Sequence, residues 1–345
     1  MPTRLAIVRD PRFLLHKTGL THPESVQRLE AVHHMLDRRF PGRLPRLSPT
    51  LAAMEQLQLA HQRPYLLRVL ATAGMARGAL AEDTPCRGSS YLAAWLAAGG
   101  CLAGLERLAA GELDVCLALV RPPGHHALAG STNGFCILNN LAVAARWAVE
   151  GLGYERVLIV DWDVHHGNGL QEILYRDRSV LYFSSHYMGT FPGTGAWDQV
   201  GQGPGRGYNL NLELPMQISD QEMVSLYAEV LGRVMRRFRP QLILVAAGFD
   251  AIRGDPLGRL RLSPRVFGRL TALLREMGRA HGSPPWLLAL EGGYDPEGLA
   301  ESVGEVVEAL FAEPPEAGEP PPASELVASL VQKARAAHAG LGVWV

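Results

Sequence analysis

The sequence contains little cysteine and almost no lysine. Four cysteines occur among 345 residues, and no two of them form a Cys-x-x-Cys pair. This spacing excludes a zinc knuckle held by thiolates and a dithiol redox motif. Lysine occurs only at positions 17 and 333, and the formal net charge is −1. A chain with neither a basic field nor an acidic tail is not expected to bind nucleic acid.

Long apolar runs are also missing. The chain is 47% hydrophobic, which is enough for a large core, but no unbroken apolar run reaches the length that crosses a membrane. Residues 1–8 predict a strand and not a signal peptide, because their apolar part is too short. We therefore expect a cytoplasmic protein with reduced cysteines and no membrane partner. The sequence leaves the oligomeric state open, a homo-oligomer included.

Short apolar runs alternate with helical patterns along the chain. Runs such as 115–120 and 157–160 predict buried strands, and the apolar spacing at 90–110 predicts a helix. This alternation is typical of a single α/β domain with a doubly wound, mostly parallel sheet flanked by helices. We expect residues 1–312 to form a catalytic domain, and residues 313–345 to form a Pro-rich linker and a terminal helix.

The stretch 157–169 combines a predicted strand with three titratable residues. Asp161, Asp163 and His165 follow the apolar run at a spacing of two, so their side chains point the same way in an extended chain. In open α/β sheets, ligands bind beyond the carboxyl ends of the strands. These residues could simply begin a capped helix, but the pattern favours a divalent metal, zinc first and iron(II) as the alternative.

The same pattern recurs at the ends of three other predicted strands. His125 with His126, Asp250 and Tyr294 each follow an apolar run. Each of them alone has a plainer explanation in loop packing, helix capping or surface exposure. Because the carboxyl ends of parallel strands share one edge of a sheet, we expect all of these residues to face one pocket together with Asp163, an active site at the strand ends.

Six motifs extend this pattern across most of the chain, from about residue 5 to 305. They are R-P-P-G-H-H at 121–126, G-F-C at 134–136, D-W-D-V-H-H-G-N-G at 161–169, F-P-G-T-G at 191–195, G-F-D at 248–250 and E-G-G-Y at 291–294. In this order they resemble the zinc-dependent histone deacetylase superfamily, and within it the class II-like and bacterial amidohydrolase branch. The resemblance implies an enzyme that removes acetyl or short acyl groups from lysine side chains or lysine-like amines.

The resemblance also implies a role for each polar residue at the strand ends. Asp163, His165 and Asp250 would bind zinc and leave a position open for water and the acyl oxygen. His126 would be the general base and the acid that protonates the leaving amine. Tyr294 would donate its hydroxyl to the developing oxyanion.

Two further residues would support the catalytic histidines. Asp161 would hold the second nitrogen of His125, which would assist catalysis electrostatically. Asn168 would orient His126 by a hydrogen bond. It carries no charge where other members of the superfamily have an aspartate.

The implied substrate contacts lie in other loops. Phe135 and Phe191 would form the walls of a narrow tunnel for an extended alkyl-amine side chain, and Asp83 would hold a backbone amide of the substrate at the rim. The remaining implied contacts are Gly134, Gly292 and Gly293. The loop 187–191 departs from the family pattern.

A structural potassium ion is implied beside the zinc. Its expected ligands are Asp161 and the backbone carbonyls of Asp163, His165, Ser184 and Ser185.

Three other functions stay open at this level. An acetylpolyamine or small-metabolite deacetylase is the nearest, because such substrates end in the same acetamide. A binuclear manganese ureohydrolase would need more metal ligands than Asp163, His165 and Asp250 supply. A catalytically silent acyl-lysine binder would be expected to lack a metal ligand or Tyr294, and all of these are retained.

Overall fold

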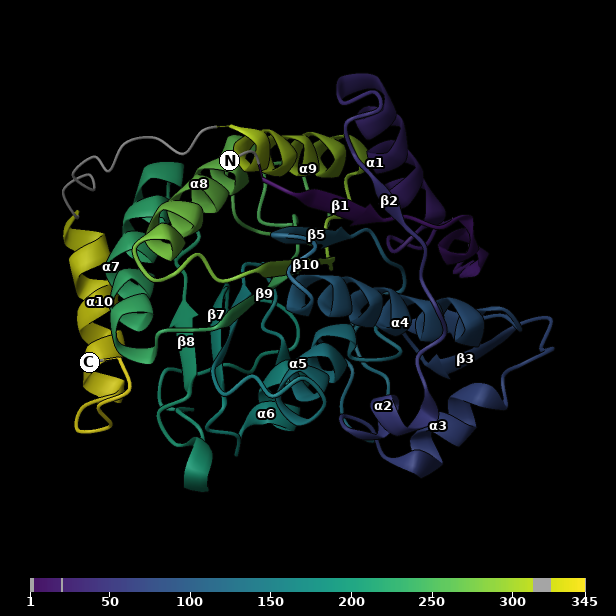
Figure 1. The fold of residues 1–345 in the computed structure, drawn as a ribbon, viewed down its shortest axis with the longest axis horizontal. Coiled ribbons are helices and arrows are strands. Elements are labelled where there is room, and N and C mark those ends of the chain that lie inside the picture. Colours follow the sequence, from purple (N-terminus) through teal and green to yellow (C-terminus); the bar gives the residue numbers. More distant parts are fainter. Residues whose placement is uncertain (1–2, 20, 313–323, 345) are drawn as a thin grey trace.

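An eight-stranded sheet runs through the centre of the protein. The computed structural model describes residues 3–19, 21–312 and 324–344. The strands of the sheet are β1 (Leu5–Val8), β2 (Arg46–Leu47), β5 (Val115–Ala118), β6 (Val157–Asp161), β7 (Val180–His186), β8 (Asn209–Glu213), β9 (Leu242–Ala247) and β10 (Trp286–Leu290). Their order is β2-β1-β5-β10-β9-β6-β7-β8, and all of these neighbouring strands pair in parallel (Figure 1).

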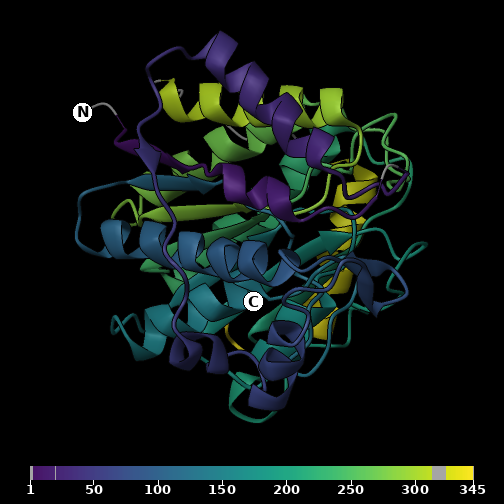
Figure 2. The same ribbon diagram turned by 90° about the vertical axis from the view of Figure 1, so that its right-hand side faces the viewer.

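Helices cover both faces of this sheet. One layer consists of five helices, each in contact with the next: α1 (Val26–Arg39), α9 (Pro296–Phe311), α8 (Arg265–Arg279), α7 (Asp220–Phe238) and α10 (Glu325–Ala337). The other layer consists of α4 (Ser90–Ala109), α5 (Asn140–Glu150) and α6 (Asn168–Leu174). Figure 2 shows α1 and α9 above the strands and α4 below them. This arrangement confirms the predicted doubly wound α/β fold.

Shorter elements lie around this body. They are η1 (Pro11–Leu15), α2 (Met54–Gln58), α3 (Arg63–Leu70), η2 (Gly203–Gly205) and an antiparallel hairpin of β3 (Gly78–Ala81) and β4 (Thr84–Cys86). Glu82 and Asp83 form the turn of this hairpin, and β4 begins at Thr84. The hairpin was missed because its strands are short and lack an apolar alternation.

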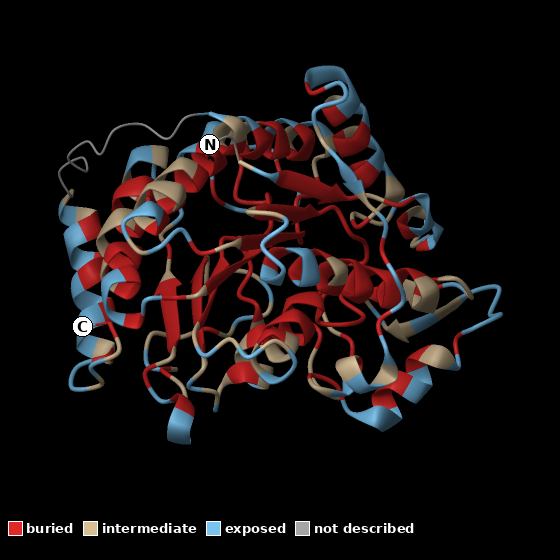
Figure 3. Cartoon of the chain, in the orientation of Figure 1, coloured by how far each residue is buried: buried red, intermediate tan, exposed pale blue. Residues whose placement is uncertain are grey.

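The central strands are buried on both faces. All five residues of β6 and all six residues of β9 are buried (Figure 3). Parallel strands that are covered by helices on both sides need apolar side chains at nearly every position. This is why an unbroken apolar run, and not an alternating one, predicted these strands correctly.

Helix α4 is long and apolar enough, by length and composition, to cross a membrane. In the fold, however, 72% of the most apolar stretch of this helix is buried, as in a core helix. Gly104 lets the helix approach β5, since a Cβ there would lie 2.5 Å from Cys116 Sγ. The prediction that no unbroken apolar run reaches the length of a membrane span still holds, because Glu106 and Arg107 interrupt α4, and packing accounts for the hydropathy of this helix.

The C-terminal helix packs on the same body. α10 contacts α7 and the edge strand β8. Most of the expected Pro-rich linker falls in 313–323, outside the described residues. The boundary at residue 312 therefore stays a prediction.

A buried cluster of charges ties the N-terminal segment to the loop after β5. Glu24 accepts hydrogen bonds from Arg121 Nε at 2.5 Å, from Arg121 Nη2 at 2.7 Å and from Arg28 Nη1 at 3.0 Å. All three side chains are fully buried. Burial alone would raise the pKa of Glu24, but the charge and hydrogen bonds of Arg121, together with the charges of His16 and Arg28, outweigh it and lower that pKa to about 2. The carboxylate is therefore the counter-charge of two buried guanidinium groups.

We expect Glu24→Gln to lower the free energy of unfolding by about 3–5 kcal/mol, because it leaves two buried cations without a counter-charge. Urea unfolding at pH 7 measures this loss. Glu30→Gln, at an exposed position of α1, is the control and is expected to change stability by less than about 0.5 kcal/mol.

The loss should depend on pH in a defined direction. The pKa of Glu24 falls from 4.5 to about 2 on folding, so its contribution is complete above pH 4.5 and disappears as the pH falls towards 2. The difference between the variant and the wild type should shrink across this window. An equal difference at every pH would contradict the ion-pair explanation.

Candidate active site

Four neighbouring strands carry the polar residues that the sequence predicted at strand ends. β5, β10, β9 and β6 are adjacent in this order and parallel, so their carboxyl ends lie at one edge of the sheet. The loops that follow them hold, in the same order, His126, Tyr294, Asp250 and Asp163. The fold thus brings residues that are far apart in the sequence to one place.

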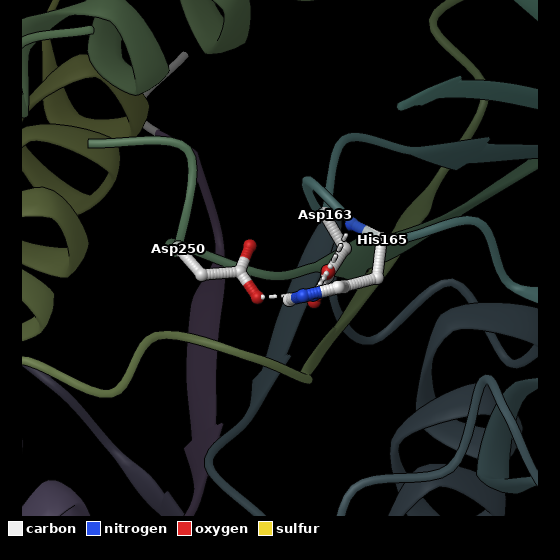
Figure 4. A group of neighbouring side chains, drawn as sticks. All are labelled: Asp163, His165 and Asp250. Carbon is white, nitrogen blue, oxygen red and sulfur yellow. Dashed lines mark hydrogen bonds and ion pairs between the residues drawn. The ribbon is translucent and has the colours of Figure 1, made fainter. Parts of the chain in front are cut away.

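Asp163, His165 and Asp250 form a buried cluster whose candidate ligand atoms all lie within 4.8 Å of one another (Figure 4). Nδ1 of His165 lies 3.1 Å from Asp163 Oδ1 and 2.9 Å from Asp250 Oδ2. Two carboxylates this deeply buried require a compensating cation or hydrogen-bond donors. An imidazole and two carboxylates are ligands that zinc and iron(II) accept, so the residues present fit a divalent metal.

Two glycines bring the backbone against this cluster. A Cβ at Gly248 would lie 2.0 Å from Asp163 Oδ2, and a Cβ at Gly292 would lie 2.1 Å from Asp250 Oδ2. The N–H of Gly292 donates to Asp163 Oδ2 at 2.8 Å. Gly292, which the sequence assigned to the substrate, therefore lies directly against the candidate metal ligands. Its neighbour Gly293 has a φ of 111°, which favours glycine.

Charge and burial set the protonation of the cluster. Burial would lower the pKa of His165, but Asp250 and Asp163 raise it well above its usual value. Burial, together with the charge of Asp163, raises the pKa of Asp250 to about 7. For Asp163 the effect of burial is outweighed by His125 and His165, which hold its pKa well below the usual range. The two buried carboxylates thus favour positive charge between them, as a divalent metal site requires.

His125 lies between two carboxylates. Its Nδ1 is 3.2 Å from Asp161 Oδ2, and its Nε2 is 3.7 Å from Asp163 Oδ2. Burial opposes its protonation, but Asp163 and Asp161 raise the pKa of His125 to about 10. Tyr182 donates its hydroxyl to the same oxygen of Asp161 at 2.8 Å. The expected contact between Asp161 and His125 is present, and Tyr182 is a partner that the motifs did not indicate.

His126 is held as a neutral imidazole. Burial lowers its pKa well below the usual value, and the charges of His125 and His165 lower it further. Its Nδ1 lies 2.8 Å from Asn168 Oδ1, while Nδ2 of Asn168 donates to Asn133 Oδ1 at 3.2 Å. This second bond turns the amide oxygen towards the imidazole. Nδ1 of His126 therefore carries the proton, and Nε2 keeps its lone pair.

Tyr294 connects the end of β10 to the start of α9. The Arg28 guanidinium lies 4.9 Å from the centroid of the Tyr294 ring. The same guanidinium donates hydrogen bonds to the backbone carbonyls of Gly293 and Glu291 at 2.5 Å each. Burial raises the pKa of Tyr294 well above its usual value, so the hydroxyl keeps its proton. The side chain remains 8% exposed. Its ring therefore lies between Arg28 and Phe135, and its protonated hydroxyl can donate a hydrogen bond.

Phe135 and Phe191 approach these residues from different loops. The centroid of the Phe191 ring lies 5.0 Å from that of His126, and the centroid of Phe135 lies 5.8 Å from that of Tyr294. Gly134 fits between His126 and Phe191, since a Cβ there would lie 2.4 Å from His126 Cδ2 and 2.8 Å from Phe191 Cε1. Phe191 is 43% exposed, so this aromatic wall reaches the surface.

Asp83 lies in the turn of the β3–β4 hairpin. Its Oδ2 accepts a hydrogen bond from the Gly134 N–H at 3.0 Å, and its Oδ1 accepts one from the Thr84 hydroxyl at 2.8 Å. Asp83 thus fixes the loop that carries Phe135. Its expected bond to a substrate amide stays a prediction.

Ser184 and Ser185 lie towards the end of β7. Ser184 is the register partner of Asp161 on β6. The Ser184 hydroxyl lies 2.9 Å from His186 Nδ1, and the Ser185 hydroxyl lies 2.7 Å from the Tyr227 hydroxyl. Protein partners therefore satisfy both side chains, and potassium binding by the backbone carbonyls stays a prediction.

Glu291 has a role that its motif alone does not reveal. Its Oε2 accepts hydrogen bonds from the N–H groups of Gly124 at 2.6 Å and His125 at 3.1 Å. Burial raises its pKa to about 7. Glu291 therefore ties the loop after β5 to the loop after β10. The available signal in the sequence was a charged residue directly at the end of an apolar run.

Comparison with known proteins identifies the family. A family model described as "Histone deacetylase domain" matches residues 22–310. The chain belongs to the histone deacetylase family. A histone deacetylase-like amidohydrolase of Pseudomonas aeruginosa is 41% identical over 276 residues, which cover 79% of this chain and 72% of that protein. A probable deacetylase of Archaeoglobus fulgidus is 35% identical over 297 residues, which cover 85% of this chain and 82% of that protein.

A plant relative adds a structural match. Histone deacetylase 15 of Arabidopsis thaliana is 38% identical over 321 residues, covering 90% of this chain but 57% of the plant protein. The crystal structure of the HDA15 HD domain superposes with a TM-score of 0.90 at 35% identity, covering 99% of this chain and 95% of that one. These matches confirm the predicted superfamily and the predicted enzyme class, a hydrolytic deacetylase.

The candidate metal cluster can be tested by removing one ligand. We expect Asp250→Ala to weaken binding of a divalent metal by more than about 100-fold, since even outer partners of metal ligands are worth about 10–100-fold. Metal content after dialysis, measured by elemental analysis, gives the result. The exposed Asp198→Ala is the control and should keep its metal. A full equivalent of metal in Asp250→Ala would disprove this ligand set.

Proposed function

We propose that the protein is a metal-dependent deacetylase that removes acetyl or short acyl groups from lysine side chains or lysine-like amines. Zinc is the proposed metal and iron(II) the alternative. The observation that carries this proposal is the combination of the Asp163, His165 and Asp250 cluster with a neutral imidazole and a protonated phenol beside it. A base, an oxyanion donor and a metal site are the parts that amide hydrolysis requires.

Asp163, His165 and Asp250 would hold the metal, which supplies Lewis acidity when bound and so polarises the acyl carbonyl and activates water. His126 accepts the water proton at Nε2 as the water oxygen attacks the acyl carbon. Asn168 accepts the hydrogen bond from Nδ1 of His126 and so keeps Nε2 available. The same imidazole then gives its proton to the leaving nitrogen as the C–N bond breaks, which releases a carboxylic acid and an amine; the acid then transfers its proton to the amine, giving a carboxylate and an ammonium.

Two groups stabilise the charge that develops during attack. Tyr294 donates its hydroxyl to the oxygen of the former carbonyl group. His125 remains protonated beside Asp161 and adds positive charge to the site. His125 and His126 therefore have different roles: His125 stays positively charged, and His126 transfers the water proton to the leaving nitrogen.

The walls of the site support a linear amine substrate. Phe135 and Phe191 offer apolar surfaces to an alkyl chain, while the polar groups gather at its acylated end. Asp83 already accepts two hydrogen bonds, and a carboxylate has further lone pairs for a substrate amide at the rim. An acetylated protein lysine fits this arrangement, and an acetylated polyamine is the alternative substrate.

Further properties belong to the same proposal. We place a structural potassium ion at Asp161 and the carbonyls of Asp163, His165, Ser184 and Ser185. The cytoplasmic location and the absence of nucleic-acid and membrane partners stay predictions, and the oligomeric state stays open.

Tyr294→Phe tests the oxyanion donor. We expect kcat to fall by about 100–1,000-fold, equivalent to roughly 2.7–4 kcal/mol, because one hydroxyl that acts in the transition state is lost. Metal content should not change. Tyr208→Phe, at a half-buried tyrosine that packs against Phe238, is the matched control. An unchanged kcat for Tyr294→Phe would remove Tyr294 from the mechanism.

The substrate class can be decided by comparing the turnover of three substrates. The zinc-loaded protein is assayed with an acetyl-lysine peptide, an acetylated polyamine and a trifluoroacetyl-lysine peptide, with a hydroxamate inhibitor as control. We expect hydroxamate-sensitive turnover of the acetyl-lysine peptide. A higher kcat/KM for the polyamine would assign the alternative substrate. No turnover of any substrate by the zinc-loaded protein would refute the proposed activity.

A further inference from the structure

Four backbone N–H groups converge on the carboxylate of Asp255. Its Oδ1 accepts from Leu257 and Gly258 at 2.9 Å each. Its Oδ2 accepts from Tyr294 at 2.6 Å and from Asp295 at 3.3 Å. The residue is 7% exposed. A hydrogen bond to an ionised acceptor is about twice as strong as one between neutral groups. It is stronger still when it is buried away from water, where the dielectric constant is low.

The two pairs of donors belong to different loops. Leu257 and Gly258 lie in the loop after β9, the same loop that carries the candidate metal ligand Asp250. Gly258 packs closely on that ligand, since a Cβ there would lie 1.7 Å from the Asp250 carbonyl oxygen. Tyr294 and Asp295 lie in the connection from β10 to α9. One carboxylate therefore joins the loop of a metal ligand to the loop of the oxyanion donor.

Other contacts fix the residues on either side of Tyr294. Upstream, the N–H of Phe249 donates to the Gly292 carbonyl at 3.1 Å. Downstream, Asp295 caps α9 by accepting from the Gly298 N–H at 3.3 Å. The bond at the Tyr294 N–H itself goes to Asp255. Because the phenol oxygen is the atom farthest from the backbone, a small rotation at this residue displaces the hydroxyl more than any other atom.

We propose that Asp255 is a positioning residue for Tyr294. Its carboxylate fixes the Tyr294 backbone against the Asp250 loop and so sets the position of the phenol hydroxyl relative to the reacting carbonyl. This inference rests on the proposed role of Tyr294 as oxyanion donor. The competing explanation is that Asp255 only stabilises the Asp250 loop and thereby retains the metal.

Asp255→Asn separates these explanations. The side-chain amide keeps the size of the carboxylate but has one acceptor oxygen in place of two, so one pair of N–H groups loses its partner. We expect kcat for the acetyl-lysine or trifluoroacetyl-lysine peptide to fall about 10–100-fold, since a displacement of about 1 Å in a catalytic group costs up to about 100-fold. KM should stay within about twofold, and one equivalent of metal should remain. Asp198→Asn, at an exposed position, is the control and should match the wild type.

A double-mutant cycle with Tyr294→Phe gives the decisive readout. If Asp255 acts through the Tyr294 hydroxyl, Asp255→Asn should lower kcat by less than about twofold when that hydroxyl is already absent. An equal fold-loss in both backgrounds would overturn the proposal. Loss of metal from Asp255→Asn would also overturn it, because the carboxylate would then act through Asp250.

Amide hydrogen exchange tests the contact without turnover and without a variant. In the wild-type protein the N–H groups of Tyr294 and Leu257 should be protected and should exchange with similar free energies of opening, because one carboxylate holds both. A Tyr294 amide that exchanges at the rate of an unprotected loop would overturn the proposal even if Asp255→Asn does not fold. Inactivity of the wild type towards every peptide would refute the proposed function, and exchange would still report on the contact.

Discussion

The active site depends on the burial of negative charge. Asp163 and Asp250 are fully buried and lie within hydrogen-bond distance of one imidazole. In a medium of low dielectric constant, two such carboxylates repel each other unless positive charge or N–H donors compensate them. The protein supplies N–H groups from His165 and Gly292 to Asp163, and from Val164 to Asp250. A bound metal cation would complete the compensation.

The same principle explains how loops from different strands are held in place. Glu291, at the end of β10, accepts from the backbone of the loop that carries His125. Asp255, beyond β9, accepts from the backbone of Tyr294. Each carboxylate thereby links two strand ends that are neighbours in the sheet. Loops that would be mobile alone become one rigid constellation, as catalysis by positioned dipoles requires.

The adjacent histidines show how environment separates two identical side chains. His125 lies between Asp161 and Asp163 and has a pKa raised to about 10. His126 faces the uncharged Asn168, and burial keeps its pKa well below the usual value. If Asn168 were a carboxylate, it would favour the charged form of His126. Neutral Asn168 therefore orients this imidazole without protonating it.

The sequence by itself determined the fully buried strands, the order of the motifs and the residues of the candidate metal cluster. Unbroken apolar runs that are followed within a few residues by Asp163, Asp250 or Tyr294 are local patterns, and a buried parallel strand imposes them locally. Tertiary structure alone decided the order of the strands, the burial of Glu24 with its arginines, and the partners of Asp255. Those contacts join segments far apart in the chain, and a carboxylate that binds backbone N–H groups places no requirement on the side chains of its partners. Such contacts leave no pattern in the sequence, and only the folded sheet, which places β5, β10, β9 and β6 side by side, brings them together.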